Sequence, residues 1–303
     1  MLMFTVLSCS KEQGAASAAA ETKSAVVGAP KGVDVAEAAA AYFADFPDGG
    51  YIINEDVFLE KVLAGEEMFV IDIRSAEDYA KGHIKGSVNM PWGPAVAAGM
   101  ASIPEGAPIY LTCYSGQTAG QAVALMNVAG IPVKSIRYGY SYGISKLEGF
   151  EAAVDTVAVE LPPASRTIDP NIQAAVDSYY AEFASLNGTP FAGNIISSEN
   201  AKKILDAGDD SVMFLDIRSA ADYAKGHIET AVNMPYGAGM QELFASLPAD
   251  KKIIVNCYSG QTAGQAVGIM KLIGYDAVSL KGGMGTPLNA PMGWVTEGFP
   301  VVE

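Results

Sequence analysis

Residues 113–123 read CYSGQTAGQAV, and residues 257–267 repeat the same eleven letters. Upstream, residues 72–91 (DIRSAEDYAKGHIKGSVNMP) and residues 216–235 (DIRSAADYAKGHIETAVNMP) agree at 16 of 20 positions. Both pairs are separated by an offset of 144 residues. Solenoid repeats are only about 20–50 residues long, whereas this offset fits a whole domain. The sequence therefore predicts a duplicated domain.

The length of the chain agrees with a duplication. At roughly 150 residues per domain, 303 residues suggest about two domains. A Pro-rich stretch near residue 160 (ELPPASRTIDP) is a natural linker. We therefore predict a signal-like segment with a flexible tether at 1–33, a first domain at 34–160, a linker at 161–170 and a second domain at 171–303.

Apolar runs and helical spacings alternate within each copy. In the first copy they predict strands at 68–73, 87–90, 109–112 and 133–137, and helices at 54–63 and 118–129. Asn54 and Ser75 stand where a side chain caps a helix. Strands that alternate with helices imply a parallel sheet covered on both faces. The predicted fold class is α/β, with two tandem domains that are each a parallel β-sheet flanked by helices.

Composition and charge exclude several classes of protein. Half of the residues are apolar and 17% are charged, which suits a folded chain. The net charge of -15 would repel phosphate backbones, so we expect no nucleic-acid partner. Three cysteines and two histidines, with no CxxC pair, indicate no disulfide scaffold, no metal site and no cofactor. No apolar run has the roughly 18 residues that span a bilayer.

The N-terminus resembles a bacterial lipoprotein signal. Met1 to Leu7 are almost wholly apolar, Cys9 follows Ser8, and small polar residues continue as a flexible tether. The resemblance implies lipidation of Cys9 and an extracytoplasmic, periplasmic protein held by a lipid anchor to a membrane. The fit to the lipobox is loose, and no basic residue precedes the apolar part. The alternative is a cytoplasmic protein with an unstructured N-terminus.

The repeated cysteine loop is where we expect the chemistry. Cys113 follows a predicted buried strand directly, and a helix is predicted to begin near Thr118. A strand, a tight loop and a helix N-terminus point backbone N–H groups at an anion. Such donors favour the thiolate over the thiol and so activate the cysteine as a nucleophile. Cys257 has the same setting, and we predict both as catalytic residues.

A buried structural cysteine is the alternative explanation for each loop. Core packing does not require an identical polar loop in two copies that differ elsewhere, so we favour a functional loop. The loop residues expected to bind the substrate are Tyr114, Ser115, Gly116, Gln117 and Thr118 in the first copy, and Tyr258, Ser259, Gly260, Gln261 and Thr262 in the second.

Taken together, these motifs resemble a known family. Asp72-Ile73-Arg74, Gly82-His83-Ile84 and a six-residue loop from Cys113 to Thr118 are similar to a rhodanese domain, and the second copy matches in the same three places. The resemblance implies a rhodanese-like α/β fold and a sulfurtransferase. In that family the cysteine takes a sulfane sulfur from a small donor such as thiosulfate, a polysulfide or a persulfide. It holds the sulfur as a persulfide and passes it to a thiol or another thiophilic acceptor.

The sequence departs from the family in two respects. Many tandem rhodaneses keep the cysteine only in the second domain, whereas both copies have it here. Many members that use thiosulfate carry Arg or Lys in the loop, and neither loop here contains one. This departure favours a polysulfide or persulfide donor.

Residues that flank the loop have plainer explanations. Asp72 and Arg74, like Asp216 and Arg218, are supporting residues that either bind the donor or form an ion pair that braces the loop. We favour the ion pair. His83 and His227 fit a turn histidine bonded to the backbone better than a catalytic base. Tyr114 and Tyr258 either line a pocket or pack against the fold.

Two other functions compete with sulfur transfer. Phosphatases with a similar loop need Cys-x5-Arg, in which the Arg clamps phosphate, and Ala119 and Ala263 occupy that position here. A non-catalytic sulfur carrier or thiol-sensing binding module stays open. A disulfide between Cys113 and Cys257 also stays open, although we expect the two loops to lie in separate pockets.

Overall fold

The computed structural model describes residues 32–303. The lipidation predicted at Cys9 and most of the tether lie outside the described residues. Within them no helix is both long enough and apolar enough to cross a membrane.

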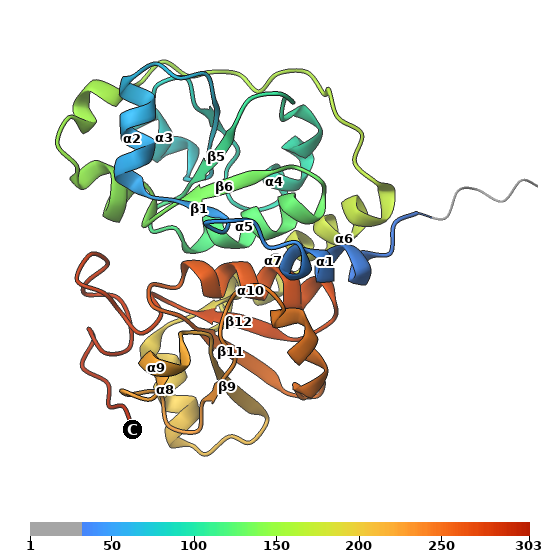
Figure 1. Ribbon diagram of the computed structural model, residues 1–303, viewed down its shortest axis with the longest axis vertical. Helices are drawn as coiled ribbons and strands as arrows, with labels where there is room; N and C mark the ends of the chain where they lie inside the picture. Colours follow the sequence, from blue (N-terminus) through green and yellow to red (C-terminus); the bar gives the residue numbers. More distant parts are fainter. Residues whose placement is uncertain (1–31) are drawn as a thin grey trace, which may run out of the picture. The chain divides into compact units, whose positions relative to one another are not determined.

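Two five-stranded sheets form the frame of the described chain (Figure 1). In the first, the strands run in the order β1 (Ile52–Ile53), β6 (Val133–Ile136), β5 (Ile109–Thr112), β2 (Phe69–Asp72) and β4 (Val88–Asn89). In the second they run β8 (Ile195–Ile196), β12 (Ala277–Leu280), β11 (Lys252–Asn256), β9 (Val212–Asp216) and β10 (Val232–Asn233). Every neighbouring pair in both sheets is parallel. The identical order confirms the predicted α/β class and the two tandem domains.

Ten α-helices of the described chain surround these sheets. They are α1 (Val35–Ala44), α2 (Glu55–Leu63), α3 (Ala76–Lys81), α4 (Pro94–Gly99), α5 (Gln117–Val128), α6 (Pro170–Ala181), α7 (Phe183–Leu186), α8 (Ser198–Asp206), α9 (Ala220–Tyr223) and α10 (Gln261–Leu272). Ser75 caps α3 as predicted, because its hydroxyl accepts the Asp78 N–H at 3.1 Å. Asn54 stands at the start of α2, but its side chain makes no cap bond.

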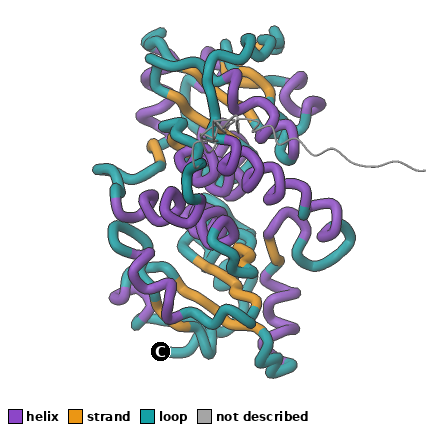
Figure 2. The backbone as a smooth tube through the Cα atoms, turned by 90° about the vertical axis from the view of Figure 1, so that its right-hand side faces the viewer, coloured by secondary structure: helices purple, strands orange, loops and turns teal. Residues whose placement is uncertain are grey.

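The helices that follow the two cysteine loops pack against each other. Figure 1 shows α5 and α10 side by side between the sheets, and Figure 2 shows the same layers from the side. A Cβ atom at Gly120 would lie 2.2 Å from the carbonyl oxygen of Gln261, and one at Gly264 would lie 2.4 Å from that of Gln117. Only glycine permits so close an approach of two backbones. The repeated sequence therefore encodes its own helix interface.

One central core joins the two halves. It contains Leu111 from β5, Leu125 from α5, Ile269 from α10 and Val255 from β11, all fully buried. A separate apolar cluster with Phe58 covers the outer face of the first sheet, and another with Trp294 covers that of the second. Burial on both faces explains why the central strands read as continuous apolar runs.

The helix that leads into each half packs on the other half. The backbone N–H of Gly239, from the second copy, donates to the carbonyl oxygen of Phe43 in α1 at 3.1 Å. Reciprocally, the Gln173 side chain of α6 donates to the Ala97 carbonyl oxygen of α4 at 3.3 Å. Phe43 also packs edge-to-face on Tyr236, as Tyr180 does on Trp92. Both halves thus contribute to each other's surface layer.

Candidate active sites

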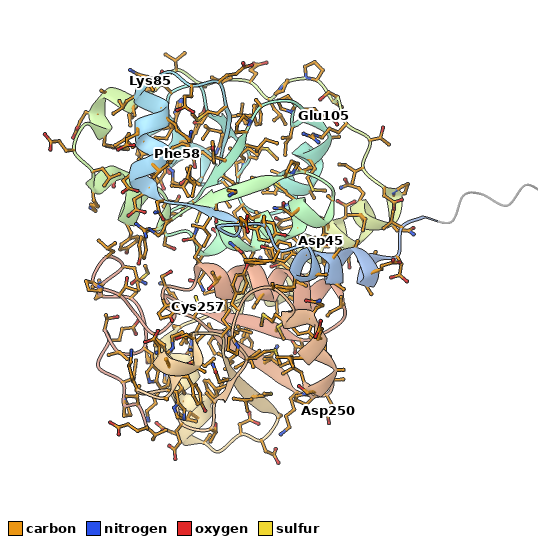
Figure 3. The ribbon with its side chains drawn as sticks, in the orientation of Figure 1. Asp45, Phe58, Lys85, Glu105, Asp250 and Cys257 are labelled. Carbon is orange, nitrogen blue, oxygen red and sulfur yellow. The ribbon has the colours of Figure 1, made fainter. Side chains whose placement is uncertain are left out.

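Each cysteine lies at the end of a central strand and just before a helix. Cys113 follows β5 directly, and Cys257, which is labelled in Figure 3, follows β11 directly. Both side chains are 1% exposed, and both are free thiols, so no disulfide joins them in this structure. The expected strand, loop and helix arrangement is present in both copies.

Two backbone donors point at each sulfur atom. The Cys113 Sγ accepts the N–H groups of Gly116 at 3.1 Å and Ala119 at 3.3 Å. The Cys257 Sγ accepts those of Gly260 and Ala263 at the same two distances. The first turn of the following helix therefore aims its unpaired N–H groups at the sulfur, which stabilises negative charge there. The arrangement suits a thiolate nucleophile or a sulfur-bearing anion.

A left-handed glycine makes the tight loop possible. Gly116 and Gly260 both have φ +89°, which residues with a Cβ rarely adopt. This turn brings the N–H of each glycine onto its own cysteine sulfur. Ser115 and Thr118 of this loop are half-buried, as are Ser259 and Thr262 in the second copy.

The supporting aspartates and arginines form buried ion pairs. The Arg74 guanidinium donates to both Asp72 carboxylate oxygens, with the closest contact at 2.6 Å, and to the Gly82 carbonyl oxygen at 2.8 Å. Arg218 repeats these bonds to Asp216 and to the carbonyl oxygen of the matching glycine. These contacts hold the end of β2 to the turn at Gly82, and the end of β9 to the turn at Gly226. The structure thus places the pair as a brace.

The two histidines hold the same turn. His83 is fully buried, its Nδ1 lies 2.8 Å from the Tyr79 carbonyl oxygen, and its ring stacks on Tyr79. The Nδ1 of His227 lies 3.1 Å from the Tyr223 carbonyl oxygen, with the same stacking. The Nε2 of His83 also lies 3.1 Å from the Val157 carbonyl oxygen and 3.2 Å from an Asp155 carboxylate oxygen. None of these partners belongs to a cysteine loop.

The loop tyrosines reach across to a short acidic helix. The Tyr114 hydroxyl donates to a carboxylate oxygen of Asp78 at 2.6 Å, and Tyr258 makes the same contact with Asp222. The bond from Tyr114, with further bonds from Lys81 and Ser75, lowers the pKa of Asp78 to about 2. Both tyrosine rings are partly exposed. They form a wall beside the loop.

A cavity of about 450 Å³ lies beside the first cysteine loop. Its lining consists of Arg74, Asp78, Lys81, Gly82, Tyr114, Tyr140, Ser141, Ser145 and Lys146. The two lysines give this cavity positive charge that the loop itself lacks. Sequence reasoning missed Lys146 and Ser145, because they belong to no motif. The one signal was that the two copies diverge after residue 137.

The segment after β6 in the first copy, and the one after β12 in the second, supports the cysteine loop from one side. In the first copy the N–H of Tyr140 donates to the Cys113 carbonyl oxygen at 2.7 Å. In the second copy the N–H of Met284 donates to the Cys257 carbonyl oxygen at the same distance. The Tyr140 ring also lies 3.5 Å from the Arg74 guanidinium carbon, a cation–π contact that Met284 cannot make. The two sites share a loop but differ in their walls.

The glutamines of the two loops require a correction. We expected Gln117 and Gln261 to bind a donor beside their own cysteines. Both side chains are instead buried and bonded to the opposite half: Gln117 donates to Ser279, and Gln261 donates to Ser135, each at 2.8 Å. The sequence could not reveal this, because the partner is set by the packing of α5 on α10.

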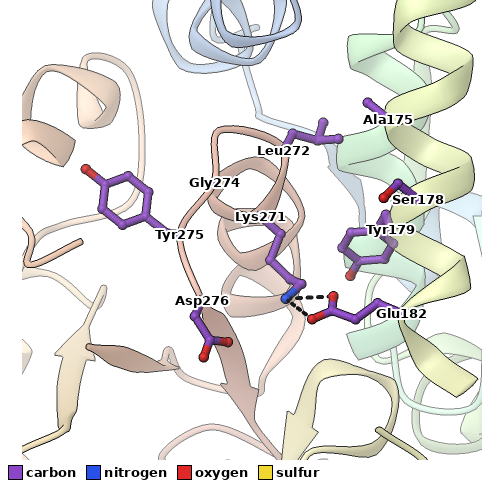
Figure 4. Close-up of a pocket in the computed structure, with 9 residues that line it drawn as sticks. All are labelled: Ala175, Ser178, Tyr179, Glu182, Lys271, Leu272, Gly274, Tyr275 and Asp276. Carbon is purple, nitrogen blue, oxygen red and sulfur yellow. Dashed lines mark hydrogen bonds and ion pairs between the residues drawn. The ribbon is translucent and has the colours of Figure 1, made fainter. Parts of the chain in front are cut away.

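The described residues contain no group of His, Cys, Asp and Glu side chains that could hold a metal ion. A further cavity of about 440 Å³ lies between α6 and the end of α10 (Figure 4). Its Lys271 ammonium is paired with the Glu182 carboxylate at 2.9 Å, and the Tyr275 hydroxyl donates to the Phe244 carbonyl oxygen. Lys271, Glu182 and Tyr275 are therefore already bonded within the fold.

Comparisons with known proteins match both of the repeated halves. The model of the rhodanese-like domain matches residues 57–146 and again residues 197–285. A sulfurtransferase from Allochromatium vinosum is 30% identical over 110 residues, which are 36% of this chain and 94% of that protein. A Bacillus subtilis candidate sulfur carrier, YrkF, is 33% identical over 78 residues, which are 26% of this chain and 42% of that protein. The match thus spans less than half of the Bacillus protein.

Solved structures also include matches at low sequence identity. The crystal structure of a 3-mercaptopyruvate sulfotransferase from Escherichia coli has 19% sequence identity and a TM-score of 0.35, covering 78% of this chain and 99% of that one. The family model matches more than half of the sequence, in two segments that each contain one cysteine loop. The chain belongs to the rhodanese-like domain family and carries two tandem copies of the domain.

Proposed function

We propose that the protein is a sulfurtransferase in which Cys113 and Cys257 each carry a persulfide. The observation that carries the proposal is that each buried sulfur accepts two backbone N–H groups at the start of a helix. This geometry supports an anionic sulfur, which both the resting thiolate and the persulfide provide. The names of relatives, including a thiosulfate:glutathione sulfurtransferase from Saccharomyces cerevisiae that is 29% identical over 97 residues, support the same chemistry.

The transfer proceeds in two displacements at sulfur. The cysteine thiolate attacks the sulfane sulfur of the donor, a new S–S bond forms, and the donor's S–S bond breaks with its electron pair on the leaving group. That group is sulfite from thiosulfate or a shortened chain from a polysulfide. An acceptor thiolate then attacks the outer sulfur, takes it as a new persulfide and returns the cysteine thiolate. Neither step needs a metal or an organic cofactor.

The cavity beside Cys113 modifies the donor preference expected from the loop alone. Lys81 and Lys146 line it and supply positive charge from outside the loop. The charge of Lys81 is shared with Glu77 and Asp78, so Lys146 is the stronger attractor for an anionic donor. We therefore propose that Cys113 accepts sulfur from thiosulfate or a polysulfide. At Cys257 we propose a polysulfide or a low-molecular-weight persulfide.

Intact mass tests this proposal. The protein is prepared as Cys113→Ser, Cys257→Ser and the double variant, all in a Cys9→Ser background that removes the third thiol. After incubation with polysulfide, the parent should gain the mass of two sulfur atoms, each single variant one and the double variant none. With thiosulfate, the parent and Cys257→Ser should each gain one sulfur atom, and Cys113→Ser and the double variant none. Cyanide or dithiothreitol should remove the added mass. A parent that gains no sulfur from either donor contradicts the proposal.

A non-catalytic sulfur carrier is the second candidate, favoured by the match to the Bacillus subtilis protein. Both candidates hold a persulfide and differ in turnover. Repeated release of sulfite from thiosulfate with glutathione as acceptor supports the enzyme. A single loading event without release to small thiols supports the carrier.

We also propose that Cys9 is lipidated and that the protein works outside the cytoplasm. Support comes from the apolar segment before Cys9 and the small polar tether after it. The test is metabolic labelling with an alkyne fatty acid in a bacterial host, comparing the full gene with Cys9→Ser. Equal label in both would contradict lipidation at this residue.

A further inference from the structure

The two loop glutamines cross between the halves in a reciprocal way. Each begins the helix after its own cysteine loop, and each inserts its amide into the opposite domain. Gln117 is 3% exposed and Gln261 is 2% exposed. Buried amides with all their bonds made to one distant segment are specific structural links, because any lost bond leaves a buried polar group unpaired.

Gln117 forms hydrogen bonds with the end of β12 and with the segment after it, which supports the Cys257 loop. Its Nε2 donates to the Leu280 carbonyl oxygen at 3.0 Å, in addition to Ser279. Its Oε1 accepts the N–H of Gly282 at 3.2 Å. Gly282 is followed by Gly283, where a Cβ would lie 2.4 Å from the Cys257 carbonyl oxygen. The Gln117 amide therefore holds the backbone at Gly282 and Gly283, which packs directly against the Cys257 loop.

Gln117 also touches the glycine that donates to the sulfur. A Cβ placed on Gly260 would lie 2.8 Å from the Gln117 Cδ, so the amide packs directly against this residue. The Gly260 N–H is one of the two donors to the Cys257 Sγ. The contact limits the positions that the Gly260 N–H can take. Gly260 has no side chain of its own that could hold its backbone in place.

Gln261 makes the mirror-image set of contacts on the first loop. Its Nε2 donates to the Ile136 carbonyl oxygen at 3.1 Å, and its Oε1 accepts the N–H of Tyr138 at 3.2 Å. A Cβ on Gly116 would lie 2.6 Å from the Gln261 Oε1. The same atoms thus meet the same parts of the opposite loop in both directions, which argues against an accidental contact.

We propose that Gln117 and Gln261 are positioning residues that act crosswise, so that each half sets the donor geometry of the other half's cysteine. Gln117 positions the Cys257 loop, and Gln261 positions the Cys113 loop. The inference deepens the proposed function and rests on it for the role of the two thiolates. Its geometric content, a cross-domain hold on the Sγ donors, can be measured without any sulfur transfer.

The test is the alkylation rate of each cysteine as a function of pH in the full chain. Iodoacetamide reacts with the thiolate, so its pH profile reports how well the loop stabilises that form, here from about pH 5 to pH 9. Trypsin separates the two sites into peptides 86–134 and 253–271, which hold one cysteine each. In Gln117→Leu we expect alkylation of Cys257 near neutral pH to slow by about three- to tenfold, with its profile moved to higher pH. The profile of Cys113 should stay in place.

Gln261→Leu should give the opposite pattern, with Cys113 affected and Cys257 unchanged. Gln121→Leu is the matched control, because Gln121 is a buried amide one turn further along α5 that bonds Tyr179 and Gly193 rather than a cysteine loop. It should leave both profiles in place. If a Leu variant does not fold, Gln117→Glu and Gln261→Glu keep the shape and are measured in the same way.

An effect confined to the cysteine of the substituted half, or equal effects on both cysteines, would overturn the crosswise role. So would profiles that do not move in a folded variant. If each glutamine variant changes the alkylation of the opposite half's cysteine, but the protein never accepts sulfur, this inference holds while the proposed function fails. The two outcomes are therefore distinguishable.

Discussion

The Tyr114 hydroxyl lies 2.6 Å from a carboxylate oxygen of Asp78, and this contact closes one side of the first cysteine loop. The bond comes from an identical loop residue in each copy, since Tyr258 meets Asp222 in the same way. It joins the cysteine loop to α3 in the first copy and to α9 in the second, and the two bonded residues are 36 positions apart in each case. The loop wall is thus tied to a group that titrates.

Removing this hydroxyl should change the titration of Asp78. The bond from Tyr114 is the largest of the influences that lower the pKa of Asp78 to about 2. In Tyr114→Phe that pKa should rise toward the usual value for Asp, and carboxyl-carbon NMR titration would follow it. Tyr258→Phe should leave Asp78 unchanged. An unaltered Asp78 titration in Tyr114→Phe would contradict the contact.

The sign of the pH dependence follows from the lowered pKa. A carboxylate whose pKa falls on folding stabilises the native state above its unfolded pKa, near 4, and loses that contribution as the pH falls through about 2. The wild type should therefore lose thermal stability relative to Tyr114→Phe between about pH 4 and pH 2. Melting temperatures of the two proteins across this range provide the measurement. Parallel curves would show that the bond does not contribute.

Lys146 should control the use of anionic donors at Cys113. In a Cys257→Ser background, Lys146→Ala should raise KM for thiosulfate by about two- to fivefold, as expected for one partly screened charge. The value of kcat should change little, because Lys146 lines the cavity and does not donate to the Cys113 sulfur. Lys146→Arg keeps the charge and is the control. An unchanged KM, or an equal rise with Lys146→Arg, would argue against an electrostatic role.

Gly116 should tolerate no side chain, for two separable reasons. Gly116→Ala must adopt φ +89° and also place a Cβ 2.6 Å from the Gln261 Oε1. Gly130→Ala is a matched control, since Gly130 has φ +77° with nothing within 4 Å. We expect the control to cost about 1 kcal/mol in the free energy of unfolding and Gly116→Ala to cost more. Urea unfolding would measure both, and equal losses would mean that the contact with Gln261 is not tight.

The buried brace should fail when one partner is removed alone. Arg74→Met leaves the fully buried Asp72 carboxylate without its cation, which typically costs about 3–5 kcal/mol in the free energy of unfolding. The double variant Asp72→Asn with Arg74→Met should recover part of this loss. Denaturant unfolding of the single and double variants completes the cycle. A double variant less stable than Arg74→Met would contradict a paired role.

The sequence alone predicts the fold and the position of the two cysteine loops because those signals are local. A continuous, mostly apolar run precedes Cys113, and Gly116 marks the tight turn of the loop. The second copy repeats both features. Residues whose role depends on the other half escape such reasoning. Gln117 carries a loop-like pattern, yet its partners lie more than 160 residues away. Lys146 lines its cavity only because the segment after β6 turns back over the loop.

The exchange of leading helices has a consequence for how the chain can be divided. The contacts between the halves occur in matched pairs, Gln117 to Ser279 and Gln261 to Ser135, as they do between the subunits of a twofold-symmetric dimer. A cut in the linker would separate two pieces, each of which lacks the helix that covers it in the intact chain, and each would expose an apolar face to water. When the two pieces are co-expressed as separate chains, they should associate with each other. The surface between the halves is built like a subunit interface, and the linker only joins them covalently.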